Sequence, residues 1–387
     1  MRRIHISSLE VFAVDLPFRV SFKHSAAERT TSESVFVKCV TDQGDTGFGE
    51  ALPRVYVTGE SQQDTFDLLA ESILPRLMDR GFSQYAEVED FLLACDGRAP
   101  AEWVDPAIPQ GAAWCAVDLA LLDTFGRAFG EKPLLARAPG SIPKDLRYSA
   151  VLSAEKGLKR DAMILAFRLA GFRHIKLKVG PETTAAVMQR IRTMAGHRMD
   201  LRTDANMGWN VEEAIAQFQA FAPYGVQSHE QPVAAADLAG MARLVRETGK
   251  QVMADESFTT RDSLQRLVER RACTAVNARI SKCGGLMATW QRCRGALDAG
   301  LTVQIGCQVG ESSLLSAAHL RLCAAVGRVK YAEGCFGELL LREDPVSPVL
   351  RFGWGGKPPV LPAGPGLGVA IDESRLMKYV TRRHRIE

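Results

Sequence analysis

The sequence predicts an α/β protein in which a barrel of alternating strands and helices follows an N-terminal α+β domain. Two observations support this fold class. From about residue 146, short apolar segments alternate with helix-like stretches, and eight such segments match the number of strands in a (β/α) barrel. In the same region Asp204, Glu230, Asp255 and Lys282 follow one another at steps of 26, 25 and 27 residues. Each step has the length of one strand, one helix and two short loops, so we expect one site built from successive strand ends.

The opening of the chain has a different pattern. Residues 4–14 and 35–40 are rich in apolar and β-branched side chains, which is typical of antiparallel strands. A turn is expected at 41–44, where the sequence reads Thr-Asp-Gln-Gly. Helical stretches are expected at about 62–82 and 110–129. These elements predict an α+β domain over residues 1–140.

The barrel is expected over residues 145–344. Its eight predicted strands are 147–152, 174–179, 201–204, 226–230, 251–255, 275–280, 301–305 and 330–332. Between them, Asn210 and Glu213 form a predicted N-cap pair at the start of an amphipathic helix. The segment 345–387 begins with a stretch rich in proline and glycine, so it is expected to pack back across the first domain rather than to extend the barrel.

Composition limits the class of protein. With 387 residues, 46% hydrophobic and 24% charged, the chain can form a large core and more than one domain. A net charge of +3 is too small to indicate a nucleic-acid or membrane partner. The nine cysteines are odd in number and include no C-x-x-C, which favours reduced thiols in a cytoplasmic protein. No signal peptide and no apolar run of membrane-spanning length is evident.

Two lysines stand two residues apart in the predicted strand 174–179. Lys176 and Lys178 therefore project from the same face of that strand. If both face the barrel mouth, mutual repulsion and burial are expected to lower the pKa of one, giving a lysine that can accept a proton near neutral pH. An exposed K-x-K on an edge strand is the alternative interpretation.

Three carboxylates end neighbouring predicted strands. Asp204, followed by Asn206, ends one strand, and Glu230 and Asp255 end the next two. Like charges in a partly dry site require protonation or a cation, and oxygen-only ligands favour a hard ion such as Mg²⁺. Taken singly, each acid also fits a helix cap or a solvated loop.

Lys282 follows a predicted strand and precedes Gly284-Gly285, which permit a tight turn into the next helix. In an eight-stranded ring it lies four strands away from Lys176 and Lys178. A lysine on each side of a bound substrate, with a metal that holds a carboxylate, can remove a proton beside that carboxylate and return one elsewhere. The metal would stabilise the resulting enediolate.

Taken together, these motifs resemble the muconate-lactonizing-enzyme-like (mandelate racemase/muconate lactonizing enzyme) subgroup of the enolase superfamily, over nearly the whole chain. The resemblance implies an N-terminal α+β capping domain, a modified (β/α)7β TIM-like barrel whose first strand is antiparallel or displaced, and a C-terminal segment that returns to the cap. It implies Mg²⁺, or alternatively Mn²⁺, as cofactor. The implied metal ligands are Asp204, Glu230 and Asp255, and the implied catalytic residues are Lys178, Lys282 and, in a supporting role, Lys176.

Substrate contacts are expected from two mobile cap loops near 18–29 and 53–60 and from the strand ends. The candidate contacts are His24, Tyr56, Asn206, Glu311 and Glu333. Dipeptide epimerases of this subgroup resemble the chain at 58–60 and 306–312. They generally have an Asp-x-Asp near the eighth strand, where this chain has Glu333-Gly334-Cys335, a departure that weighs against an ordinary dipeptide epimerase.

The predicted function is that of a Mg²⁺-dependent isomerase, either a cycloisomerase or a racemase/epimerase, which removes the proton α to a carboxylate. A lyase, such as a dehydratase or an o-succinylbenzoate-synthase-like enzyme, is the alternative that uses the same intermediate. A non-catalytic binding protein on the same fold is an alternative of another class. The expected partners are a small-molecule carboxylate and further copies of the chain in a homo-oligomer.

Overall fold

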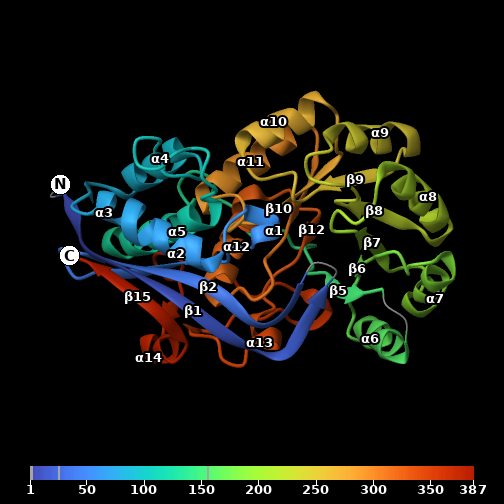
Figure 1. Ribbon diagram of the computed structural model, residues 1–387. Coiled ribbons are helices and arrows are strands. Elements are labelled where there is room, and N and C mark those ends of the chain that lie inside the picture. The colour runs from blue at the N-terminus through green and yellow to red at the C-terminus, as the bar shows by residue number, and fades with distance from the viewer. Residues whose placement is uncertain (1–2, 25–26, 155–156) are drawn as a thin grey trace.

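The computed structural model describes residues 3–24, 27–154 and 157–387, and it describes no side chains for residues 20–28. Figure 1 shows two lobes, a cap that contains both ends of the chain and a barrel on the opposite side. Among the described residues, no helix is both long enough and apolar enough to cross a membrane. The nine cysteines, all within the described ranges, form no disulfide.

The cap is an antiparallel sheet covered by helices. Its strands are β1 (Ile4–His24), β2 (Ala27–Thr41), β3 (Thr46–Ala51), β4 (Gly81–Phe82) and β15 (Val380–Ile386). Their order is β15-β1-β2-β3, and β4 also pairs with β1. The cap helices are α1 (Val55–Thr58), α2 (Gln62–Leu68), a π-helical turn (Leu69–Ile73), α3 (Leu74–Leu77), α4 (Tyr85–Cys95) and α5 (Gly111–Phe129).

Helix α5 packs unusually close to β3 because two glycines of β3 face it. A β-carbon on Gly47 would lie 2.3 Å from the backbone nitrogen of Thr124, and one on Gly49 would lie 1.9 Å from the carbonyl oxygen of Ala116. Only residues without a side chain fit at these two positions. The alternate spacing of the two glycines puts both on the same face of the strand.

The barrel consists of eight parallel strands in the order β12-β11-β10-β9-β8-β7-β6-β5. A parallel bridge between Tyr148 and Ala332, with the Ser149 N–H donating to the Ala332 carbonyl over 2.9 Å, connects the two ends of the sheet. The strands are β5 (Ala150–Ser153), β6 (His174–Lys178), β7 (Asp200–Asp204), β8 (Val226–Glu230), β9 (Gln251–Ala254), β10 (Ala275–Ala278), β11 (Thr302–Ile305) and β12 (Tyr331–Ala332).

Seven long helices of the described chain connect these strands. They are α6 (Leu158–Leu169), α7 (Ala185–Ala195), α8 (Val211–Phe221), α9 (Leu238–Thr248), α10 (Arg261–Glu269), α11 (Leu286–Asp298) and α12 (Ser313–Val326). After β12 only a short helix follows, α13 (Gly337–Leu340). The (β/α)7β barrel with an antiparallel-sheet cap is therefore confirmed. The expected antiparallel or displaced first strand is wrong, because β5 pairs parallel with β6 in continuous register.

The remaining elements lie in short connections and in the C-terminal segment. They are two 3-10 turns (Ala222–Tyr224 and Trp354–Gly356), β13 (Val346–Ser347), β14 (Ala370–Ile371) and α14 (Glu373–Met377). Strand β15 then pairs antiparallel with β1, with Leu9 opposite Ile386, as the adjoining blue and red strands of Figure 1 show.

One expected cap loop has a different structure. Residues 18–29 were expected to form a loop, but β1 and β2 extend as a hairpin in which Phe22 pairs with Arg29 and His24 with Ala27. Residues 18–23 do alternate, with Phe18, Val20 and Phe22 separated by polar residues, so a local sign of a strand was present. The expectation of a loop came from the family resemblance. The second segment, 53–60, contains the single turn α1.

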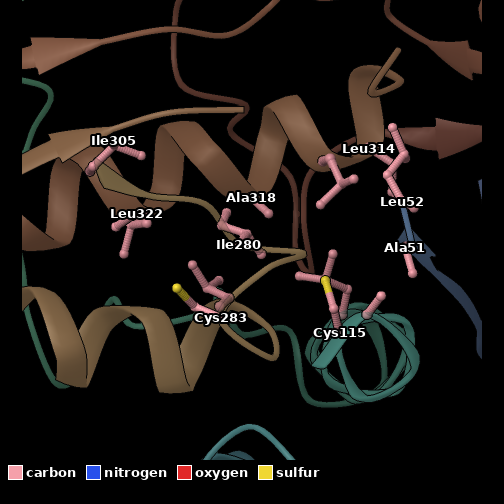
Figure 2. Packing of buried hydrophobic residues seen from close by; sticks show 14 of the residues in the cluster. Ala51, Leu52, Cys115, Ile280, Cys283, Ile305, Leu314, Ala318 and Leu322 are labelled. Carbon is pink, nitrogen blue, oxygen red and sulfur yellow. The ribbon is translucent and has the colours of Figure 1, made fainter. Parts of the chain in front are cut away.

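A continuous apolar core joins cap and barrel. Figure 2 shows Ala51 and Leu52 of the cap beside Leu314 and Ala318 of α12, with Cys115 of α5 nearby. All five side chains are at most 1% exposed. The cap therefore lies firmly on the α12 side of the barrel.

Candidate active site

The carboxyl ends of the barrel strands bring the predicted residues together at one end of the barrel. Lys178, Asp204 and Glu230 are the last residues of β6, β7 and β8, and Asp255 directly follows β9. Beside them lies a cavity of about 300 Å³, lined by Lys176 and Lys178, by polar side chains of several strand ends, and by apolar side chains of α6, α13 and the C-terminal segment.

Lys176 lies inside a group of carboxylates. Its Nζ is 2.6 Å from Glu333 Oε2, 3.2 Å from Glu230 Oε1 and 3.5 Å from Asp204 Oδ2. Burial alone would lower the pKa of this lysine, but the charges of Glu230, Glu333 and Asp204 outweigh it and raise the pKa above its ordinary value. Lys176 is therefore a fixed cation that holds these acids together.

This finding narrows one expectation. Repulsion between Lys176 and Lys178 was expected to lower the pKa of one of them, and that lysine is not Lys176, whose pKa is raised. Three carboxylates within 3.5 Å provide more favourable charge than one neighbouring lysine removes.

Lys178 is the lysine that faces the cavity with a partly exposed side chain. Its Nζ donates to Asn206 Oδ1 over 2.8 Å and lies 3.6 Å from Asp204 Oδ2. Asn206 holds its position in a left-handed backbone conformation (φ 45°), just beyond the end of β7. The amide of Asn206 also approaches Glu256 Oε1 at 3.4 Å. Asn206 thus orients Lys178 toward the cavity wall.

Lys282 is in the opposite situation. Its side chain is fully buried, and its Nζ is 2.8 Å from Asp255 Oδ1 and 2.8 Å from the carbonyl oxygen of Asn277. It does not line the cavity that contains Lys178. The strands β6 and β10 are nonetheless four apart in the sheet, as the spacing predicted. The two lysines therefore lie on opposite sides of the barrel but are not equally accessible.

Arg279 is a site residue that the motif search missed. Its guanidinium donates to Asp255 Oδ2, contacts Glu230 Oε1 at 3.6 Å and donates to Gln308 Oε1 at 3.0 Å. Burial alone would raise the pKa of Asp255, but Arg279 and Lys282 together lower it to about 2. The sequence did contain a sign of this residue. Arg279 comes three residues before Lys282 and two residues after Asn277, and in an extended segment residues two apart share a face.

Further missed residues form a polar layer inside the barrel. Asn277 donates to Glu230 Oε1 at 2.8 Å, and Gln304 donates to Glu230 Oε2 at 3.3 Å. Arg202 is buried and contacts Glu333 Oε1 at 3.2 Å. Asn277 and Gln304 are polar side chains in mainly apolar strands, and that contrast was the signal to follow. Arg202 had no such contrast, because β7 reads Asp-Leu-Arg-Thr-Asp.

The three candidate metal ligands supply hard oxygen donors, which suit Mg²⁺. Asp204 Oδ2 is buried and accepts no hydrogen bond. Among the described residues, no three His, Cys, Asp or Glu side chains are grouped closely enough to hold a metal ion. Glu230 and Asp255 are instead paired with Lys176 and Arg279. The donor chemistry fits the ion, and so does Asp204 Oδ2, which has lysine ammonium groups at 3.5 and 3.6 Å but accepts no hydrogen bond. The ion would take over part of the charge balance that the cations now provide.

The five candidate substrate contacts have different outcomes. Tyr56, Asn206 and Glu333 line the cavity. Glu311 does not: it is buried, and one of its oxygens accepts from the Gln308 N–H over 2.6 Å. The side chain of His24 lies outside the described part of the structure.

The barrel, its cap and this set of lysines and carboxylates define a protein of the enolase superfamily. The family model Enolase C-terminal domain-like matches residues 161–375, and the chain belongs to this family.

Several relatives align over almost the whole chain. The L-Ala-D/L-Glu epimerase of Clostridium acetobutylicum is 29% identical, covering 94% of this chain and 98% of the relative. The N-succinyl-L-Arg/Lys racemase of Bacillus cereus is 26% identical, covering 96% and 97%. The crystal structure of a dipeptide epimerase from Cytophaga hutchinsonii, complexed with Mg and the dipeptide D-Ala-L-Val, superimposes with a TM-score of 0.86 at 26% identity, covering 99% of this chain and 100% of that one.

Proposed function

We propose that this protein is a Mg²⁺-dependent racemase or epimerase that removes the proton α to a carboxylate and returns a proton to the same carbon. The observation that supports it best is the placement of Lys178 at the end of β6 and of Lys282 in the turn after β10, two strands that are four apart, with Asp204, Glu230 and Asp255 at the ends of the strands between them. The names of the relatives, epimerases and a racemase, point to the same class of reaction.

The chain's own residues supply the proton transfers. Lys178 in its neutral form takes the α proton, and the electron pair of the broken C–H bond passes into the carboxylate, which leaves an enediolate. Lys282 in its ammonium form returns a proton to the other face of the carbon. Lys176 keeps positive charge beside Glu230 and Asp204 throughout.

Asp204, Glu230 and Asp255 would hold Mg²⁺, which would supply positive charge to offset the charge that develops on the substrate carboxylate. Mn²⁺ is a second candidate for the same ligands. A homo-oligomeric state and a cytoplasmic location remain predictions from the sequence.

The two lysines make the proposal testable. In D₂O with Mg²⁺, the wild-type protein should exchange the α proton of both enantiomers of a substrate, followed by proton NMR over a panel of amino acids, acylated amino acids, dipeptides, muconates and sugar acids. Lys178→Ala should stop exchange from one enantiomer and Lys282→Ala from the other. Each loss should be about 10²–10⁴-fold, which is the range of general acid–base catalysis.

The same experiment separates the alternatives. A cycloisomerase or a lyase would change the carbon skeleton or release a leaving group, both visible in the NMR spectrum, and would depend strongly on one lysine only. If no compound exchanges and calorimetry detects no Mg²⁺ binding, the enzyme proposal fails in favour of a binding protein.

A further inference from the structure

The cavity beside Lys178 has two chemically distinct parts. Its floor is polar, with Lys176, Lys178 and Arg279, and its outer wall is apolar. Four phenylalanines of the wall contact one another in a row: Phe167 with Phe172 at 5.1 Å, Phe172 with Phe352 at 5.8 Å, and Phe352 with Phe336 at 5.8 Å between ring centroids. Leu339 and Met163, 58% and 37% exposed, complete the wall. The wall therefore offers apolar surface that no described part of the chain covers fully.

The charges that line the cavity favour an anion chiefly beside Lys178. Among the lining side chains that the structure describes, Lys176, Lys178 and Arg279 are cationic and Glu333 is the one carboxylate, and both Lys176 and Arg279 are already paired with acids at the strand ends. Both oxygens of Glu333 are paired: Oε2 lies 2.6 Å from Lys176 Nζ, and Oε1 lies 3.2 Å from Arg202 Nη2. Because two cations already compensate this acid, it has no net negative charge to offer a positively charged ligand.

We infer that this site takes a monoanionic carboxylic acid with a bulky apolar group, preferably aromatic, and without an ammonium group. The inference rests on the proposed function for the position of the carboxylate, near the lysines. The apolar group then lies against the phenylalanine row. An ammonium group beside the phenylalanine row would meet apolar wall, and the neutral oxygens of Tyr56, Asn206 and Gln308 that also line the cavity carry no charge to offset its loss of hydration. The cavity volume of about 300 Å³ is at the lower end of the range for small-molecule sites, which fits a compact acid.

A matched set of compounds tests each part of the inference. N-propionyl-L-phenylalanine and L-alanyl-L-phenylalanine have the same shape and the same carboxylate, and differ in one ammonium group. N-propionyl-L-alanine lacks the aromatic group. Binding is measured by calorimetry with Mg²⁺ present, and α-proton exchange is measured separately in D₂O. We expect N-propionyl-L-phenylalanine to bind at least about ten-fold more tightly than either of the other two.

A wall variant tests the location. Leu339→Asp places an unpaired carboxylate in the wall at an exposed position, so it should leave the fold intact. It should change the ratio of the binding affinities of the two phenylalanine compounds by about ten-fold or more in favour of L-alanyl-L-phenylalanine. Val360→Asp is the matched control, because Val360 is 88% exposed and does not line the cavity. The control should leave the ratio unchanged.

The outcomes separate this inference from the proposed function. Tighter binding of L-alanyl-L-phenylalanine, or no binding of any compound, overturns the inference. Exchange that is faster with the dipeptide overturns it while the proposed function stands. The expected binding order without any exchange supports the inference and counts against the proposed function. If Leu339→Asp and Val360→Asp change the ratio of the two affinities equally, the assignment of the wall as the binding surface is overturned.

Discussion

The two halves of the barrel differ in how they meet the cap. On the side of α11 and α12, the cap supplies a buried acid to the start of each helix. Asp118 of α5 accepts from the Leu286 N–H of α11 over 2.7 Å, and Glu50 of β3 accepts from the Ser312 N–H at the start of α12 over 3.0 Å. These acids satisfy amide groups that a helix leaves unpaired at its N-terminus. This half is anchored to the cap.

The half around β5, β6 and α6 is more open. Helix α6 exposes several large apolar side chains, among them Leu158 at 82% and Leu169 at 68%. The cavity opens beside this helix, with Met163 and Phe167 in its wall. The two candidate lysines follow the same division: Lys282 is fully buried in the anchored half, and Lys178 faces the cavity in the open half. The anchored half therefore holds charged groups in fixed pairs, whereas the open half contains the cavity.

The largest expected effect comes from removing Asp255 in the anchored half. Asp255→Ala leaves Arg279 and Lys282 buried without their shared carboxylate. Breaking a buried pair in this way typically costs about 3–5 kcal/mol. Urea unfolding followed by circular dichroism, with a chelator present, measures this loss.

The double variant Asp255→Ala/Arg279→Met is the control for charge. It removes one of the two uncompensated cations, so it should unfold at a higher urea concentration than Asp255→Ala alone. A loss below about 1 kcal/mol for the single variant would contradict the picture of a tightly paired, rigid half.

The second effect concerns the pH dependence of the anchor. Burial raises the pKa of Asp118 to about 8 from an ordinary value of 3.8. The folded protein therefore keeps a proton that the unfolded chain releases. The contribution of protonated Asp118 to the free energy of unfolding is complete below about pH 4 and is lost as the pH rises to about 8. The slope is at most about 1.4 kcal/mol per pH unit for one proton.

Asp118→Asn isolates this contribution, because the amide cannot release a proton. Between pH 5 and pH 8 the stability of the wild type should fall relative to that of Asp118→Asn, as read from urea midpoints at each pH. A constant difference across this range would show that Asp118 is ionised in the folded protein.

The sequence predicted the framework of the molecule well, for physical reasons that individual elements illustrate. Strand β8 was predicted at 226–230 and occurs at Val226–Glu230, because turn residues bound it on both sides. Helix α5 was predicted at 110–129 and begins one residue later. Such elements have local signals that the fold only reinforces. The hairpin strands within 18–29 also had a local signal, since Phe18, Val20 and Phe22 alternate with polar residues, but the loop expectation from the family resemblance overrode it.

The site was predictable in its positions but not in its pairing. The predicted strands placed Lys176 and the three acids near the same end of the barrel. The pKa of Lys176, however, depends on Glu333, which lies 157 positions later in the chain. Likewise, the contact between Arg279 and Glu230 exists only because the barrel brings β8 and the end of β10 together. Spacing along the chain predicts which residues share an edge, whereas ion pairs follow from the closed barrel.

A smaller effect should come from one hydrogen-bonded contact between cap and barrel. Ser281 Oγ accepts from the Leu52 N–H over 2.9 Å and donates to the Leu52 carbonyl at 3.2 Å. Both residues are fully buried, so Ser281→Ala leaves a backbone donor without a partner. The expected loss is about 1–2 kcal/mol in urea unfolding. Ser281→Thr retains the hydroxyl and serves as the control, and an equal loss in both variants would point to packing rather than to the hydrogen bond.

The smallest effect is expected on the open half. Leu169 of α6 is 68% exposed and does not line the cavity. Leu169→Ala removes little buried area and keeps a good helix former, so the stability should change by less than about 0.5 kcal/mol. The same urea titration measures it at several protein concentrations. A larger loss that grows on dilution would show that α6 is covered by another copy of the chain, and the open half would then be an interface rather than a free surface.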